Sequence, residues 1–170
     1  SKTKLSDDYK ELLLNKDFWF YVFVMGFSVG SYFSFLTGAP VISAEYFELA
    51  PSVQGYLFAI LGFGFFLGNF LTGRFAMKIG PNRFMLWGCF VALTGPVLQI
   101  LIYLNFTFGP LSFFTPMFLV GLGQGLIVPN AAAGILSVNP KYAGSASGLG
   151  ATIQVMIGGI LAYATGYIIS

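Results

Sequence analysis

Histidine is absent from this 170-residue chain, cysteine occurs once, and charged residues make up only 8% of it. Without histidine the sequence offers no metal-ligand cluster, and the lone Cys89 cannot form an intramolecular disulfide. We therefore expect no metal and no cofactor. No pairing of a nucleophile with a general base is visible, which argues against an enzyme. With so few charged groups, we also expect no nucleic-acid partner.

Carboxylates are missing from the interior of five long apolar stretches. A membrane-spanning helix needs about 20 predominantly apolar residues to cross a hydrocarbon core of about 30 Å, and each stretch has that length. The stretches are Phe18–Pro40, Val53–Gly73, Phe84–Leu104, Phe113–Ser137 and Ser145–Ile169. Hydrophobic residues make up 56% of the chain, more than a soluble protein of this size could bury. The sequence therefore predicts an all-α fold: a polytopic helical bundle over residues 18–170, embedded in a lipid bilayer.

Lys and Arg are absent from two of the loops between these stretches. Ser43–Ser52 carries Glu45 and Glu48, and Asn105–Ser112 carries no charge. All basic residues fall on the other side of a five-crossing arrangement, namely Lys2, Lys4, Lys10, Lys16, Arg74, Lys78, Arg83 and Lys141. The positive-inside rule makes that side cytoplasmic, so the N-terminus is expected in the cytoplasm.

Residues 1–17 form a polar segment before the first span. Leu5, Tyr9, Leu12 and Leu13 recur at helical spacing, with charged residues between them. This pattern predicts a short amphipathic helix along the cytoplasmic membrane surface, although a plain solvated linker is the alternative. The chain starts with Ser, which suggests a portion of a longer protein.

Polar side chains inside the spans are the candidate functional groups. In the first span Ser28, Ser31 and Tyr32 share a helix face, Phe35 adds a ring, and Pro40 is expected to end the helix. The deep amides are Gln124 and Asn130 in the fourth span and Gln154 in the fifth. Two interpretations are open: a face for close helix packing, or the wall of a polar cavity.

The turn after the second span reads Gly73-Arg74-Phe75-Ala76-Met77-Lys78-Ile79-Gly80-Pro81-Asn82-Arg83. It resembles the loop signature of the major facilitator superfamily at Gly73, Lys78 and Gly80. Met77 replaces the signature Asp, and only Arg83 remains of the terminal basic pair.

Two further stretches resemble the Bcr/CflA-type drug-resistance transporters of that superfamily. Thr37–Phe58 is similar to their seventh and eighth helices, and Pro129–Leu149 to their tenth and eleventh. The resemblance implies helices seven to eleven of a twelve-helix protein, without its N-terminal half and twelfth helix.

The resemblance implies proton-driven export of small drugs by alternating access. From the polar and aromatic residues of the spans we expect the cavity wall at Ser28, Ser31, Tyr32, Phe35, Gln124, Asn130 and Gln154. We expect a conformational loop at Gly73, Lys78, Gly80 and Arg83. The expected partners are a small-molecule substrate, protons, and the missing half and helix, in a bacterial inner membrane. Glu45 is the one acid with a plausible proton-linked role, because no carboxylate lies within a span.

A scaffold that binds partner helices through small-residue faces is the competing hypothesis. Water access to Tyr32 and Gln124 distinguishes the two, since a cavity wall is wet and a packing seam is not. An ion channel lacks support, because no charged ring or filter motif is visible.

Overall fold

Helices account for almost all of the computed structural model, which describes residues 9–106 and 108–169. No strand occurs in these residues. The long helices are α2 (Lys16–Glu45), α3 (Pro51–Ile79), α4 (Pro81–Asn105), α6 (Met117–Val138) and α7 (Ala143–Ile169). A short α5 (Pro110–Phe114) precedes α6, and the 3-10 turn η1 (Pro140–Tyr142) precedes α7. The predicted all-α bundle is confirmed, with five segments in the described residues long and apolar enough to cross a membrane.

Two predicted helix ends are wrong. Pro40 lies inside α2, which continues to Glu45, because one proline removes a single backbone hydrogen bond that a long helix tolerates. The expected loop from Gly73 to Arg83 is helical except at Gly80. Gly80 adopts φ 102°, a conformation that favours glycine, and Pro81 begins α4 at once.

The fourth span is interrupted near its start. Thr115 and Pro116 separate α5 from α6. Two hydrogen bonds between residues three apart, as in a 3-10 helix, bridge the break: Phe118 N donates to Thr115 O, and Leu119 N donates to Pro116 O. Pro129, by contrast, lies inside α6 without ending it. The break therefore lies at the end of the span near the uncharged loop.

The segment before α2 folds back on the bundle. Residues 9–14 are helical, while the start of the predicted amphipathic helix at Leu5 lies outside the described residues. Leu12 is buried together with Phe18 and Val22. Asn15 then caps α2, its side-chain oxygen accepting from Asp17 N at 2.8 Å and from Phe18 N at 3.2 Å.

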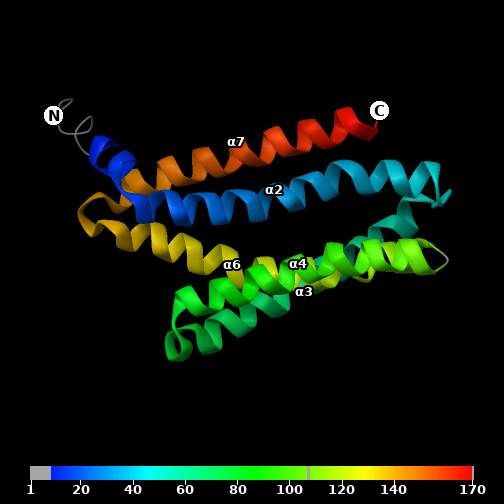
Figure 1. The fold of residues 1–170 in the computed structure, drawn as a ribbon, viewed down its shortest axis with the longest axis horizontal. Coiled ribbons are helices and arrows are strands. Elements are labelled where there is room, and N and C mark those ends of the chain that lie inside the picture. The colour runs from blue at the N-terminus through cyan, green and yellow to red at the C-terminus, as the bar shows by residue number, and fades with distance from the viewer. Residues whose placement is uncertain (1–8, 107, 170) are drawn as a thin grey trace.

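The helices form two groups joined by α6. In Figure 1, α7 runs beside α2, whereas α3 and α4 lie together on the other side of the molecule. α6 packs against both α3 and α4, and it also contacts α2 and α7. Any relative movement of the two groups must therefore involve the surfaces of α6.

Glycines let α6 approach its neighbours at backbone distance. Gly121 faces α3, where a methyl group would overlap the carbonyl oxygen of Leu61. Gly123 faces α4, where a methyl group would overlap the carbonyl oxygen of Gly88. Gly64, Gly68 and Gly125 make similarly close backbone contacts across the α3–α6 interface. The glycines of the fourth span thus serve close packing.

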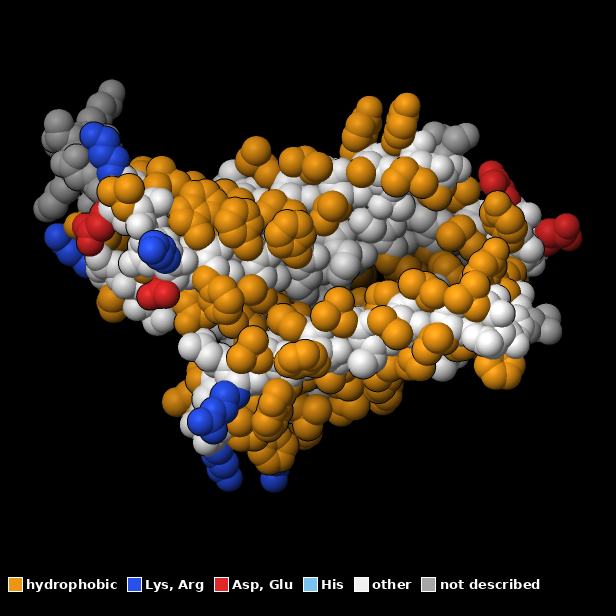
Figure 2. Space-filling view, in the orientation of Figure 1, with side chains coloured by type: hydrophobic (Ala, Val, Ile, Leu, Met, Phe, Trp, Pro, Cys, Tyr) orange, Lys and Arg blue, Asp and Glu red, His pale blue; other side chains and the backbone are white. Residues whose placement is uncertain are grey.

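The outer surface is apolar along the helices and charged at the ends. Figure 2 shows hydrophobic side chains over the length of the bundle, with Lys and Arg gathered toward one end and only acidic charges at the other. This arrangement places the predicted basic and non-basic loops at opposite ends of the bundle, as a five-span protein in a bilayer requires.

Candidate functional site

A cavity opens where α2, α3, α6 and α7 meet. We call it the four-helix pocket; it has a volume of about 340 Å³. Tyr32 and Phe33 line it from α2, Phe65 from α3, Gln124 from α6 and Gln154 from α7. Three of the polar residues that the sequence singled out therefore meet at one place, although they come from three different helices.

Gln124 fastens α6 to α2 beside this pocket. Its side chain is only 4% exposed, and its Nε2 donates to the backbone oxygen of Ser28 at 2.8 Å and to Ser31 Oγ at 3.3 Å. Ser31 Oγ in turn donates to the same Ser28 oxygen at 2.7 Å. An amide at membrane depth needs partners, and here the first span supplies them.

Gln154 differs from Gln124, Asn69 and Gln99, whose carboxamides are all hydrogen-bonded. Within the described residues its carboxamide makes no hydrogen bond, and neither does the hydroxyl of Tyr32. Gln99, by contrast, donates to Phe113 O at 3.2 Å, and Asn69 donates to Phe65 O at 2.9 Å. The four-helix pocket therefore presents two polar groups that the described chain leaves for water, a ligand or another part of the protein.

Four predicted cavity residues do not line this pocket. Ser28 and Ser31 bond Gln124 beside it, while Asn130 and Phe35 lie elsewhere. Asn130 is 4% exposed and faces α3, donating to Leu126 O at 2.7 Å and contacting Thr72 Oγ1 at 3.4 Å. Its position is a packing position, because the α3–α6 interface satisfies it. Phe35 belongs to an aromatic cluster with Phe58, Phe113 and Phe114.

Sequence reasoning missed Phe33, Phe65 and Thr72. The rings of Phe33 and Phe65 line the four-helix pocket. Thr72 Oγ1 donates to Gly125 O at 3.0 Å and so joins α3 to α6. A hydroxyl inside a span was the available signal for Thr72, but nothing in the sequence separates these rings from the many lipid-facing ones.

The predicted conformational residues surround the turn between α3 and α4. Gly73 has open space where a side chain would lie, and Lys78 is exposed in the last turn of α3. Gly80 makes the turn, and Arg83 is exposed in the first turn of α4. Glu45 is exposed at the end of α2.

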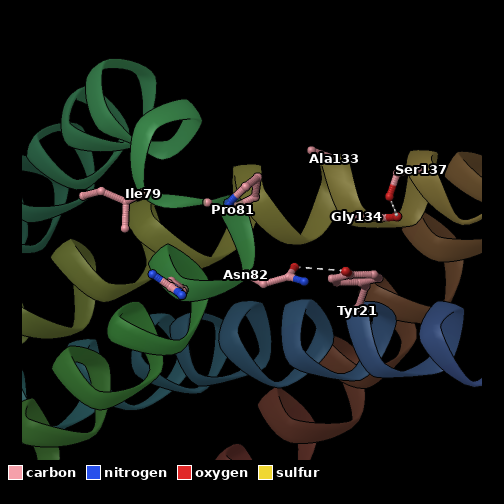
Figure 3. A pocket seen from close by; sticks show the side chains of 9 residues that line it. Tyr21, Ile79, Pro81, Asn82, Ala133, Gly134 and Ser137 are labelled. Atoms are coloured by element: carbon pink, nitrogen blue, oxygen red, sulfur yellow. Dashed lines mark hydrogen bonds between the residues drawn. The ribbon is translucent and has the colours of Figure 1, made fainter.

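A second cavity, the turn pocket, lies beside this turn and has a volume of about 680 Å³. Figure 3 shows Tyr21 of α2 and Asn82 of the first turn of α4 pointing toward each other across it. The Tyr21 hydroxyl donates to Asn82 Oδ1 at 3.0 Å. The Tyr21 ring also lies against Gly134 of α6, where it fills the space that a methyl group would need. Tyr21 thus joins α2, α6 and the turn.

No group of three or more His, Cys, Asp or Glu side chains that could hold a metal ion occurs in residues 9–106 and 108–169. The chemistry that the described spans offer is hydrogen bonding by hydroxyls and amides next to aromatic rings. That arrangement is suited to binding a small molecule.

The sequence profile described as Major Facilitator Superfamily matches residues 1–163. The chain belongs to the Major Facilitator Superfamily. It is therefore an integral membrane protein of a transporter family, which agrees with its five apolar helices. No solved structure matches the chain significantly.

Curated relatives agree with this family. An "Uncharacterized transporter" of Rickettsia bellii is 29% identical over 161 residues, covering 89% of this chain and 40% of that protein. The "Uncharacterized MFS-type transporter YdgK" of Bacillus subtilis is 24% identical, covering 88% and 37%. A "Bicyclomycin resistance protein homolog" of Haemophilus influenzae is 27% identical, covering 83% and 35%. The chain thus spans about two fifths of the length of these superfamily members.

Proposed function

We propose that this chain is part of a secondary active transporter that exports small drugs or metabolites by alternating access. Its family supports transport, and the name of the Haemophilus influenzae relative supports the Bcr/CflA-type drug-resistance subfamily. The distribution of Lys and Arg supports a cytoplasmic N-terminus. Its relatives come from bacteria, which supports the inner membrane as the location.

The four-helix pocket carries this proposal. A seam built only for packing would satisfy its polar groups, as the α3–α6 interface satisfies Asn130. Tyr32 and Gln154 instead line a cavity, and their polar side-chain groups have no hydrogen-bond partner in the described chain. In this proposal Ser28, Ser31 and Gln124 hold α2 on α6, while Tyr32 and Gln154 face the substrate.

In this proposal the α2–α7 pair moves relative to α3, α4 and α6 during alternating access. The contacts that join the two groups are candidates for holding one conformational state. They include the Gln124 bonds to α2 and the Tyr21–Asn82 bond at the Gly73–Arg83 segment. The proposed conformational role of Gly73, Lys78, Gly80 and Arg83 would then depend on Tyr21.

Proton coupling, if antiport is the mechanism, needs an ionisable group that titrates near mid-membrane. Helices α6 and α7 contain no charged residue, and Glu45 is exposed at the end of α2. We therefore propose that the coupling carboxylate lies in the N-terminal half of the complete transporter. This half and a twelfth helix would be the protein partners of the segment.

Thiol accessibility tests the cavity. In the Cys89→Ser background, cysteine would replace Tyr32, Gln154 or Asn130, and a membrane-impermeant maleimide would be applied to right-side-out and inside-out vesicles. We expect labelling of the first two positions from at least one side, and none at buried Asn130. Equal protection of all three positions would contradict the cavity and favour the scaffold hypothesis.

Drug-resistance complementation tests the function. The segment would be expressed in an efflux-deficient bacterial strain alone and with the remainder of its parent protein. Resistance that requires both parts is expected. Resistance from the segment alone would contradict the proposed division of labour, and resistance from neither, despite insertion, would contradict drug export.

A further inference from the structure

The aromatic cluster lies beside the four-helix pocket, toward the end of the bundle that carries Glu45 and Glu48. Phe35 follows Tyr32 by three residues on α2, about 4.5 Å along the helix axis. Both rings pack against the buried group that contains Leu61, and Leu61 itself lines the pocket. The aromatic cluster therefore bounds the pocket on the side that the charge pattern assigns to the cell exterior.

The short helix α5 supplies two of the four rings in this cluster. Phe113 and Phe114 are 7% and 0% exposed, and their ring centroids lie 6.1 Å and 5.9 Å from that of Phe35. Phe114 also contacts Phe58 of α3, with ring centroids 5.6 Å apart. These contacts are complete within the described residues, so the burial of the two rings does not depend on any further part of the protein.

The break between α5 and α6 leaves the backbone oxygen of Phe113 without a backbone donor. In a continuous helix Met117 N would donate to this oxygen, but no such bond forms in the described residues. Pro116 has no N–H, and its ring crowds the preceding turn. Gln99 of α4 takes the place of the missing donor, because its Nε2 donates to Phe113 O at 3.2 Å. An unsatisfied carbonyl at membrane depth is costly, so this bond stabilises the break.

Gly95 brings α4 close to the break. It lies four residues before Gln99 and so on the same helix face, and a methyl group there would lie 2.8 Å from the Pro116 oxygen. We propose that Gln99 is a positioning residue: it holds α5 at its angle to α6 and so keeps Phe113 and Phe114 at the exterior side of the pocket. This inference rests on the proposed transport function, in which the pocket opens and closes toward the exterior.

Hydrogen exchange tests the position of α5 directly. Gln99→Met keeps the length of the side chain but removes its donor. In the complete transporter in nanodiscs, we expect amide exchange of residues 110–119, measured by mass spectrometry, to become about fivefold faster, the effect of losing one hydrogen bond. Thr94→Val is the matched control on α4, because the Thr94 hydroxyl donates to Val91 O of its own helix and its loss should leave this exchange unchanged. Unchanged exchange in Gln99→Met would overturn the inference.

A variant of Pro116 links the effect of Gln99 to the break. Pro116→Ala restores an N–H and lets α5 continue into α6, so that Met117 N can donate to Phe113 O. In the Pro116→Ala background, Gln99→Met should therefore cause no further acceleration of exchange. Equal acceleration in both backgrounds would mean that Gln99 does not act through the break, and this result would also overturn the inference.

Thiol labelling separates positioning from general stability. Gln154→Cys in the Cys89→Ser background reports access to the pocket. In right-side-out vesicles we expect Gln99→Met to raise the rate of labelling by a membrane-impermeant maleimide about fivefold, with no rise in inside-out vesicles. An equal rise from both sides would show that Gln99 has only a structural role, against the inference.

Flux separates this inference from the proposed function. Faster exchange of α5 and side-specific labelling in Gln99→Met, without drug transport by the unmodified transporter in proteoliposomes, would refute export yet support the role of Gln99. Transport together with unchanged exchange and labelling in Gln99→Met would support export but overturn that role.

Discussion

Helices α6 and α7 are similar in sequence and opposite in environment. Both are apolar, rich in glycine, free of charge and equipped with a glutamine. Yet in the span that contains α6, 61% of an apolar stretch of 18 residues is buried inside the protein. In the span that contains α7, only 6% of such a stretch is buried. The difference lies in their neighbours: α6 packs between α3 and α4 and also touches α2, whereas α7 packs mainly along α2.

The same residue types therefore do different work in the two helices. Gly121 and Gly123 of α6 lie directly against the backbone of a neighbouring helix. Gly144 and Gly148 of α7 contact no neighbouring helix. Gln124 is buried and hydrogen-bonded to α2, while Gln154 is half-buried and its side chain has no hydrogen-bond partner in the described chain. Residue type in a membrane helix thus does not reveal its role until the neighbouring helices are placed.

The largest effect that tests this comparison is expected from glycine. Gly121→Ala forces a methyl group into the Leu61 carbonyl and should destabilise the protein by about 3 kcal/mol, since neither backbone can retreat easily. Gly148→Ala, in open space on α7, should have no cost and gain slightly in helix propensity. Unfolding in detergent, followed by circular dichroism, measures both. Equal destabilisation by the two variants would remove the distinction between α6 and α7.

A smaller effect is expected from the two glutamines. Gln124→Leu removes the two hydrogen bonds that the carboxamide donates to Ser31 Oγ and the Ser28 oxygen, so it should cost about 1 kcal/mol of stability. Gln154→Leu breaks no hydrogen bond in the described chain and should leave stability unchanged while reducing transport. If Gln154→Leu proved the more destabilising of the two, the carboxamide would be structural and its assignment to substrate wrong.

The smallest effect concerns the hydrogen bond between Tyr21 and Asn82 at the turn pocket. Tyr21→Phe removes only the hydroxyl that donates to Asn82, and the ring stays on Gly134. We expect a coupling of about 0.5 kcal/mol between Tyr21→Phe and Asn82→Ala in a double-mutant cycle of unfolding free energies. A coupling of zero would mean that this bond does not join the two helix groups, and Tyr21→Phe would then leave transport unchanged as well.

Much of the fold was predictable because a membrane helix must be long enough to cross the bilayer and must make its own backbone hydrogen bonds. The five spans followed from apolar runs, and the charge pattern followed from the loops. The helix ends were less predictable. Pro40 did not end α2, since a long helix absorbs one missing hydrogen bond, and the turn at Gly80 is much shorter than the loop that Gly73–Arg83 suggested.

The candidate site was predictable in composition but not in geometry. Tyr32, Gln124 and Gln154 were identified as polar groups inside spans, and they do meet in one pocket. Asn130 was identified on the same grounds, but it donates to Leu126 O of its own helix and to Thr72 Oγ1 of α3. Phe35 lies in a separate aromatic cluster with Phe58 and Phe113. A polar residue in a span must find a partner, but the sequence does not say which helix provides it.

The sequence by itself determined the solvent, the number of spans, the side that carries the basic residues and the family. Each of these depends on local properties: the length of an apolar run, the charge of a loop, or a motif. Only the tertiary structure decided which glycines are contacts and which amide is left without a partner. The reason is that lipid and protein neighbours are both apolar, so a membrane helix lacks the polar face that would show, in a soluble helix, which side is buried.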